Sequence, residues 1–262
     1  VFNQIGPLID IISSNLYRVS EKGSDTMTIK VFIGWDSREA IAYEVAKKTL
    51  LENSSIEIDI FPIKLNEMIS QGIYTRGVDP LASTEFTYSR FFVPYLNQYN
   101  DWAIFVDCDF LFFGDIVELI SYCDPSKAVL CVQHDYKPKD STKMDGQAQT
   151  VYPRKNWSSF MLFNCGHSST KKLTPELINR ESGAYLHRMQ WADDSEIGSL
   201  PAGWNWLEGW DNIPDKGFPQ AVHYTRGGPW FENYQNVQYA EIWRRHAAEI
   251  QNKTEVVNST GS

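Results

Sequence analysis

The chain contains the stretch Trp102-Ala-Ile-Phe-Val-Asp-Cys-Asp-Phe-Leu-Phe-Phe-Gly-Asp115, on which most inferences from its 262 residues depend. Residues 103–106 are apolar, β-branched or aromatic, which is typical of a central parallel strand covered on both faces. Asp107 and Asp109 then project to the same side of an extended backbone. Two charges this close stay ionised most easily around a cation, and oxygen ligands suit Mg²⁺ or Mn²⁺. The stretch predicts a divalent metal site that holds a diphosphate at the carboxyl edge of a sheet, or, as the alternative, a solvated strand end.

The first part of the chain has the pattern of a parallel sheet with helical crossovers. Asp36 or Ser37 can cap a helix over residues 38–51, and Pro62 is expected to stop the strand before it. Alternation of strands with helices predicts an α/β fold. Four apolar runs are the expected strands besides residues 103–106: 29–33, 56–61, 127–132 and 160–163. Neither a G-x-G-x-x-G loop nor a P-loop follows the first strand, so a phosphate site would need metal and basic side chains.

The remaining segments are expected to be helices and loops. Residues 65–84 are predicted to form a loop, and Pro94 is predicted to kink or end the helix that contains it. Residues 135–154 are polar and form a candidate lid or acceptor-binding loop. The expected helices are 85–98, a short one from Asp115, one from Thr174-Pro175 and a final amphipathic one over 234–250.

Length and composition predict one domain with short additions. A hydrophobic content of 42% is ample for a core. We expect an N-terminal extension or linker over residues 1–27, one domain over residues 28–250, and a polar, disordered tail over residues 251–262.

Charge and cysteine content exclude several classes of protein. A net charge of −9 argues against a nucleic-acid surface and against a polybasic membrane anchor. The four cysteines show no C-x-x-C spacing, which fits reduced thiols better than disulfides or zinc. No apolar run approaches the length of a transmembrane segment. These features predict a protein of the cytoplasm, or one peripheral to a membrane.

Four stretches, taken in order, resemble the GT-A glycosyltransferases and, among them, glycosyltransferase family 8. They are Tyr88-Ser-Arg-Phe-Phe-Val-Pro-Tyr-Leu96, residues 104–119 with the Asp-x-Asp block, Asp193-Asp-Ser-Glu-Ile197 followed by Leu200-Pro-x-x-Trp-Asn205, and His223-Tyr-Thr-Arg-Gly-Gly-Pro-Trp230. The resemblance covers about residues 28–230 and implies an α/β/α sandwich around a mixed, mainly parallel sheet.

The resemblance also implies an activity. The protein would move a hexose from a nucleotide sugar, most simply a UDP-sugar, to a hydroxyl of a glycan or another acceptor, with retention of configuration. Asp107, Asp109 and His223 would bind Mn²⁺ or Mg²⁺ under the diphosphate of the donor. A lone histidine is more often a packed or surface residue, and the metal role of His223 depends on the resemblance alone.

Further positions acquire roles in donor binding from the same resemblance. Arg90 would reach phosphate or donor sugar, and its alternative is an ion pair on a helix. Gly34 and Asp36 would face the base and ribose, although a helix cap accounts equally well for Asp36. Asp193 or Asp194 would lie beside the anomeric carbon or bind sugar hydroxyls, and the alternative is a helix start.

The chain departs from the family pattern in two places. Trp157-Ser-Ser159 replaces the Asn-x-Gly common before the following strand, which leaves the donor sugar open. Gly228 replaces the lysine that commonly precedes Pro-Trp, and Arg226, beside the donor-binding position Gly227, is expected to supply the missing charge.

Two other functions compete with a transferase. An aspartate-nucleophile phosphatase also has Asp-x-Asp after a strand, but it needs Thr or Val where this chain has Leu111. A non-catalytic module that binds carbohydrate or nucleotide sugar fits the nine Trp and thirteen Tyr. An intact metal triad favours the enzyme.

Overall fold

The computed structural model describes residues 29–80, 82–135 and 154–260. The expected extension over residues 1–27 lies outside this range, and so does nearly all of the expected loop 135–154.

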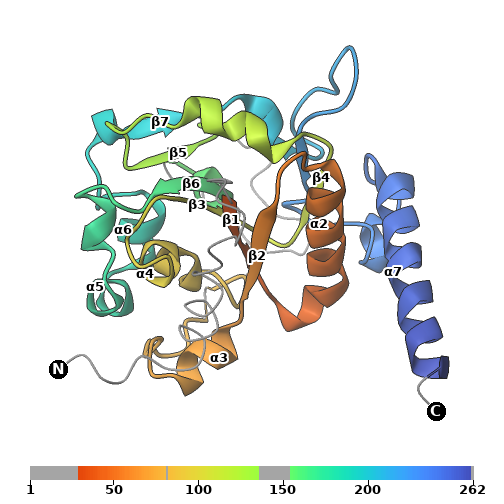
Figure 1. The fold of residues 1–262 in the computed structure, drawn as a ribbon, viewed down its shortest axis with the longest axis horizontal. Coiled ribbons are helices and arrows are strands. Elements are labelled where there is room, and N and C mark those ends of the chain that lie inside the picture. The colour runs from red at the N-terminus through yellow and green to blue at the C-terminus, as the bar shows by residue number, and fades with distance from the viewer. Residues whose placement is uncertain (1–28, 81, 136–153, 261–262) are drawn as a thin grey trace, which may run out of the picture.

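A six-stranded sheet forms the centre of the molecule (Figure 1). Its strands, in spatial order, are β2 (Ile58–Ile63), β1 (Ile29–Gly34), β3 (Trp102–Val106), β6 (Phe160–Asn164), β5 (Val129–Cys131) and β7 (Ile197–Ser199). β6 is antiparallel to both β3 and β5, and all other pairs are parallel. The predicted α/β fold with a mixed, mainly parallel sheet is confirmed, and β3 is buried at its centre as its apolar run predicts.

The prediction that Pro62 ends the second strand is wrong. Pro62 lies inside β2 and is paired with Ile33 of β1. β2 has a neighbour on one side only, and an edge strand tolerates the missing N–H of proline.

A second, three-stranded sheet carries the other half of the candidate site. Its order is β4 (Phe110–Phe112), β9 (Ala221–His223) and β8 (Trp206–Leu207), with β4 and β9 antiparallel. Helix α2 (Ala40–Asn53) packs on this sheet through buried Ala42 and Val45, as its predicted apolar face requires. Figure 1 shows α7 (Ala240–Thr260) on the outer side of α2.

Two helix predictions need correction. The final helix begins at Ala240 instead of residue 234, because residues 232–234 form a separate 3-10 turn. It then continues to Thr260, through most of the segment predicted to be a disordered tail. Residues 65–84 are not all loop, since α3 covers Leu65–Ser70.

The predicted helix over residues 85–98 is also different in the structure. A 3-10 helix covers Ser89–Phe92, and α4 covers only Val93–Leu96. Pro94 lies in the first turn of α4, where no N–H is needed, and so begins a helix instead of ending one.

Short helices complete the described fold. Asp115 and Thr174 cap the elements predicted to start there, η3 and α5. The remaining elements are η1 (Ser37–Glu39), η3 (Ile116–Tyr122), η4 (Trp157–Ser159), η5 (Thr170–Lys172), α5 (Pro175–Arg180), α6 (Gly183–His187), η6 (Asp194–Glu196), η7 (Ala202–Asn205) and η8 (Glu232–Tyr234).

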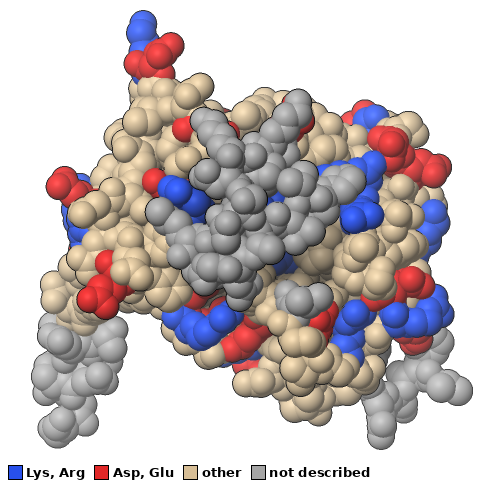
Figure 2. Space-filling view, turned by 180° about the vertical axis from the view of Figure 1, so that it is seen from behind, with Lys and Arg blue, Asp and Glu red and all other residues tan. Residues whose placement is uncertain are grey.

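The surface carries charges of both signs. On the face seen in Figure 2, acidic and basic side chains are interspersed around the described surface instead of forming one broad basic area. Among the described helices, none has both the length and the apolar character that crossing a membrane requires.

Candidate functional site

The two sheets bring three predicted ligands together at one edge of the molecule. Asp107 directly follows β3, Asp109 directly precedes β4, and His223 is the last residue of β9. Phe110 pairs with His223, and the Tyr224 N–H donates to the Asp109 carbonyl over 3.0 Å. One ligand atom of each residue in the triad Asp107, Asp109 and His223 lies within 4.8 Å of the other two. The strand register therefore builds the cluster.

The imidazole of His223 is fixed by a buried hydrogen-bond chain. His223 Nδ1 lies 2.8 Å from Asn205 Oδ1, and both residues are almost completely buried. The Asn205 amide donates to the Asn156 carbonyl over 3.1 Å and to Ser159 Oγ over 2.9 Å, so its oxygen has to face the imidazole. Nδ1 is therefore the protonated nitrogen, and the lone pair of Nε2 faces Asp109.

The second ring nitrogen of His223 faces a carboxylate oxygen of Asp109. His223 Nε2 and Asp109 Oδ2 are 3.4 Å apart, longer than the 2.7–2.9 Å typical of a charge-assisted hydrogen bond. Oδ1 of Asp109 is buried and accepts no hydrogen bond from the described residues. Two carboxylates and one neutral imidazole are a suitable donor set for a divalent cation, which would satisfy these atoms. The triad fits the metal that the fold family implies.

Arg90 lies behind the triad and contacts Asp107. Its Nη1 is 2.9 Å from Asp107 Oδ1, without hydrogen-bond alignment, and donates to the Ser158 carbonyl over 2.8 Å. The guanidinium also lies over the rings of Phe86 and Phe105. Burial raises the pKa of Asp107, and the charge of Arg90 opposes that effect. Arg90 forms the ion pair foreseen as an alternative, with a carboxylate of the triad as its partner.

The positions predicted to face the base and ribose are packed by the protein itself. A Cβ on Gly34 would lie 2.5 Å from the Phe86 ring, so glycine permits this close contact. Asp36 is fully buried and caps η1, accepting from the Arg38 N–H over 3.0 Å and from the Glu85 N–H over 3.1 Å. Its capping role is confirmed, and contact with a nucleotide stays a prediction.

Asp193 and Asp194 are not brought to the triad by any contact among the described residues. Asp193 forms a capping box with Glu196 at the start of η6. Asp194 is 89% exposed and pairs with Arg154. The helix-start alternative accounts for the local geometry of both carboxylates, and their catalytic role stays a prediction.

Arg226 and Gly227 form a tight turn after β9. Arg226 Nη2 lies 2.9 Å from Oε2 of the buried Glu208, in the space where a Cβ on Gly209 would fall. Gly227 has a φ of +127°, which favours glycine, and the Tyr234 ring covers it. Glu208 already neutralises the charge predicted to meet a phosphate.

Three residues near the site were not predicted from the sequence. Glu39 lies at the start of α2, and burial together with Asp109 raises its pKa to about 8. His134 follows β5 and has a buried Nε2 without a hydrogen bond from the described residues. His187 contacts Ser158 Oγ over 2.8 Å, and burial lowers its pKa to about 3. No local pattern marks these residues, because only the tertiary fold brings them near the triad.

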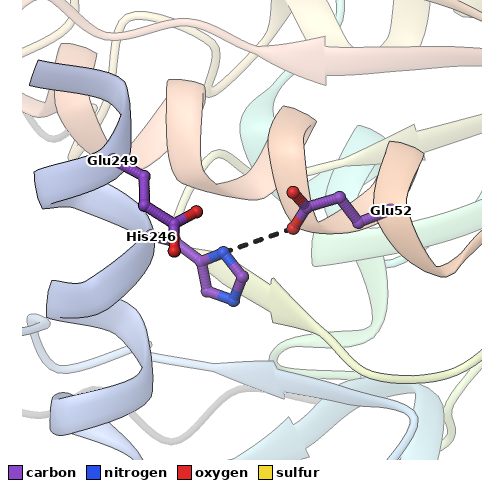
Figure 3. Close-up of side chains that lie close together, drawn as sticks. All are labelled: Glu52, His246 and Glu249. Carbon is purple, nitrogen blue, oxygen red and sulfur yellow. Dashed lines mark ion pairs between the residues drawn. The ribbon is translucent and has the colours of Figure 1, made fainter. Parts of the chain in front are cut away.

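A second cluster of possible ligands joins α2 to α7. Figure 3 shows Glu52 of α2 facing His246 and Glu249 of α7. His246 Nδ1 is 3.3 Å from Glu52 Oε2. The Lys48 ammonium pairs with both carboxylates, at 2.9 Å from Glu249 Oε2. This cluster already contains a cation supplied by the protein.

Comparison with known proteins agrees with the geometry. The chain is 48% identical over 241 residues to Protein CDI of Arabidopsis thaliana, covering 90% of this chain and 93% of that protein. The chain belongs to the family of Protein CDI. No protein-family model matches it.

Solved structures place the family fold among the GT-A glycosyltransferases. The WbbM bifunctional glycosyltransferase superposes with a TM-score of 0.61 at 18% identity over 86% of this chain. GlyE of Streptococcus pneumoniae TIGR4 gives 0.57 at 17% identity over 84% of the chain. The galactosyltransferase LgtC, solved with donor and acceptor sugar analogs, gives 0.54 at 12% identity, also over 84%.

These identities are low, so the likeness concerns the fold. The chain spans 50% of the WbbM chain, 60% of GlyE and 96% of LgtC. The resemblance to the GT-A fold is confirmed. Membership of family 8 is a finer statement that these likenesses do not reach.

Proposed function

We propose that this protein is a metal-dependent glycosyltransferase that moves a hexose from a nucleotide sugar, a UDP-hexose, to a hydroxyl of a glycan or another acceptor. One observation carries the proposal: at the edge of the sheet, Asp109 Oδ2 faces His223 Nε2, and the buried Asp109 Oδ1 accepts no hydrogen bond from the described residues. A cation would satisfy both, and the diphosphate of a nucleotide sugar needs such a cation.

The triad and the two residues that contact it have separate tasks. Asp107, Asp109 and His223 would hold Mn²⁺ or Mg²⁺, which, when bound, neutralises charge on the diphosphate leaving group. Arg90 holds Asp107 in place through their ion pair. Asn205 keeps the lone pair of Nε2 on the side of the ligands.

We also propose the domain bounds, the stereochemistry and the donor contacts that the resemblance implies. The domain spans residues 28–250, belongs to glycosyltransferase family 8 and transfers with retention. Gly34, Asp36, Arg226 and Gly227 contact the donor. For Arg226 this requires an exchange of partner from Glu208 to phosphate, and its side chain, 32% exposed, has room for that movement.

The proposal also gives Asp193 or Asp194 the position beside the transferred sugar. The exposure of these carboxylates favours the alternative function, a module that binds nucleotide sugar without transferring it. Hydrolysis of a bound donor distinguishes the two functions. The enzyme releases free sugar slowly, and the module releases none.

The test is calorimetric titration of UDP into the protein with Mn²⁺ and with EDTA, repeated on Asp109→Ala. We expect binding that needs both the metal and Asp109. Binding of GDP in place of UDP would contradict the choice of donor alone. Absence of nucleotide binding under every metal condition would contradict the transferase.

A further inference from the structure

Glu39 is a carboxylate near the triad that the proposed mechanism does not use. It lies at the C-terminal end of η1 and is the N-cap residue of α2. Its side chain makes no capping hydrogen bond. The helix end therefore does not explain where this carboxylate points.

The packing of α2 on β4 places Glu39 beside Asp109. Near the end of α2, Asn53 donates to the Phe112 carbonyl over 3.1 Å, and Thr49 Oγ1 accepts from the Phe112 N–H. One to two turns earlier, the buried side chains of α2 share a hydrophobic cluster with Leu111. Because the helix runs back along the strand, its N-cap residue Glu39 comes near the residue before β4, which is Asp109.

Two carboxylates of this region have no lysine or arginine as a partner. Arg38 pairs with Asp36, and Arg90 pairs with Asp107. Asp109 faces the imidazole of His223, and the carboxylate of Glu39 has no hydrogen bond or ion pair with the part of the chain that the structure describes. Once ionised, Asp109 and Glu39 would match the charge of one Mg²⁺ or Mn²⁺ ion.

We infer that Glu39 is the second uncompensated carboxylate of the metal centre and raises the affinity of the triad for a divalent cation. Glu39 lies outside the group of ligand atoms within 4.8 Å of one another, so it supports the cation from beyond the triad. This inference rests on the proposed metal site and adds a residue to it that neither the Asp-x-Asp pattern nor the closing histidine predicts.

The test compares Mn²⁺ affinity, measured by calorimetry without nucleotide, in the native protein, Glu39→Gln and Glu44→Gln. Glu44 is an exposed carboxylate of the same helix, so its variant matches the charge change and controls for long-range electrostatics. We expect Glu39→Gln to weaken binding about tenfold and Glu44→Gln to leave it within about twofold. Equal affinities in the two variants would overturn the inference.

A second readout separates metal binding from folding. Glu39→Gln removes no hydrogen bond, and it removes a like charge only where Glu39 is ionised. We therefore expect the Tm of the metal-free protein to stay the same or rise, while the Tm increase on adding Mn²⁺ becomes smaller. A lower metal-free Tm with an unchanged metal response would assign Glu39 a structural role instead. Asp109→Asn, measured in parallel, reports on the proposed function itself. If Asp109→Asn binds Mn²⁺ as tightly as the native protein, the metal site fails; if only Glu39→Gln does so, the inference fails alone.

Discussion

The triad Asp107, Asp109 and His223 and the α2–α7 cluster of Glu52, His246 and Glu249 offer the same ligand types in different electrostatic surroundings. In the α2–α7 cluster, Lys48 contacts both carboxylates, each of which is 47% exposed. In the triad, Asp109 is 18% exposed and faces His223 Nε2 without a cation. Ligand composition alone therefore does not identify a metal site. The distinguishing property is how the positive charge of the protein is placed: Lys48 contacts both carboxylates of the α2–α7 cluster, whereas Arg90 contacts Asp107 and leaves Asp109 without a lysine or arginine partner.

The largest expected difference between the two clusters is their response to Mn²⁺. At about 100 times the dissociation constant, a bound ion stabilises a protein by about 2.7 kcal/mol, which raises Tm by about 5–10 °C at this chain length. Asp109→Asn should abolish the increase, because it removes a ligand charge from the triad. Glu249→Gln should retain it. A response lost in Glu249→Gln and kept in Asp109→Asn would reverse the assignment.

Asn205→Leu should weaken Mn²⁺ binding by about 10–100-fold, measured by calorimetry. The substitution removes the acceptor that holds the proton on His223 Nδ1, so Nε2 can carry it and lose its lone pair. His246→Gln, at the α2–α7 cluster, is the matched control and should leave the affinity unchanged. Native affinity in Asn205→Leu would show that the orientation of the imidazole does not depend on Asn205.

The pH dependence of the free energy of unfolding distinguishes His187, which lies near the triad, from His246 of the α2–α7 cluster. Burial lowers the pKa of His187 to about 3, whereas an unfolded histidine titrates near 6.5. Below pH 6.5 the unfolded chain therefore binds a proton that the folded protein excludes. This histidine should lower the free energy of unfolding by about 1.4 kcal/mol per pH unit as the pH falls from 6 to 5.

Urea unfolding at several pH values checks this expectation. His187→Gln should show the shallower pH dependence. His246→Gln should change the slope less, since Glu52 favours the protonated form of His246 and opposes the lowering of its pKa by burial. Equal slopes in native protein and His187→Gln would contradict the burial of a neutral imidazole.

The smallest expected effect comes from removing Lys48, so that the α2–α7 cluster loses its cation and becomes more similar to the triad. Lys48→Met removes the internal cation and should lower the free energy of unfolding by about 1 kcal/mol in metal-free buffer. Lys48→Met should also be combined with Asp109→Asn. We expect Zn²⁺ to raise the Tm of this double variant and not that of Asp109→Asn alone, because Glu52, His246 and Glu249 then have no lysine beside them. No gain with Zn²⁺ would show that geometry, beyond charge, excludes metal there.

The sequence predicts best where the determining contacts are local. The apolar run of β3 has the length of a buried strand, and Asp107 follows where it breaks, so both strand and ligand could be foreseen. The caps formed by Asp36, Asp115 and Thr174 also follow from neighbouring residues.

Prediction from the sequence fails where contacts between segments far apart in the chain determine the structure. That Arg90 contacts Asp107 depends on how the 3-10 helix Ser89–Phe92 packs against β3, and Pro62 is tolerated because β2 has one neighbour. His223 could be proposed only through resemblance, since no local pattern distinguishes it from a packed histidine. No sequence pattern marks Glu39, because only the packing of α2 on β4 brings it near Asp109.

The pairing of Phe110 with His223 has a consequence for biosynthesis. During translation, both aspartates leave the ribosome long before β9 is made, and until then no strand exists that can present the histidine. A slip of one residue in this pairing would also turn the imidazole to the opposite face of the sheet. The nascent chain therefore cannot retain a metal ion at this site until β9 has paired in the correct register. At the proposed site, metal capture would thus be a late event that reports on successful folding.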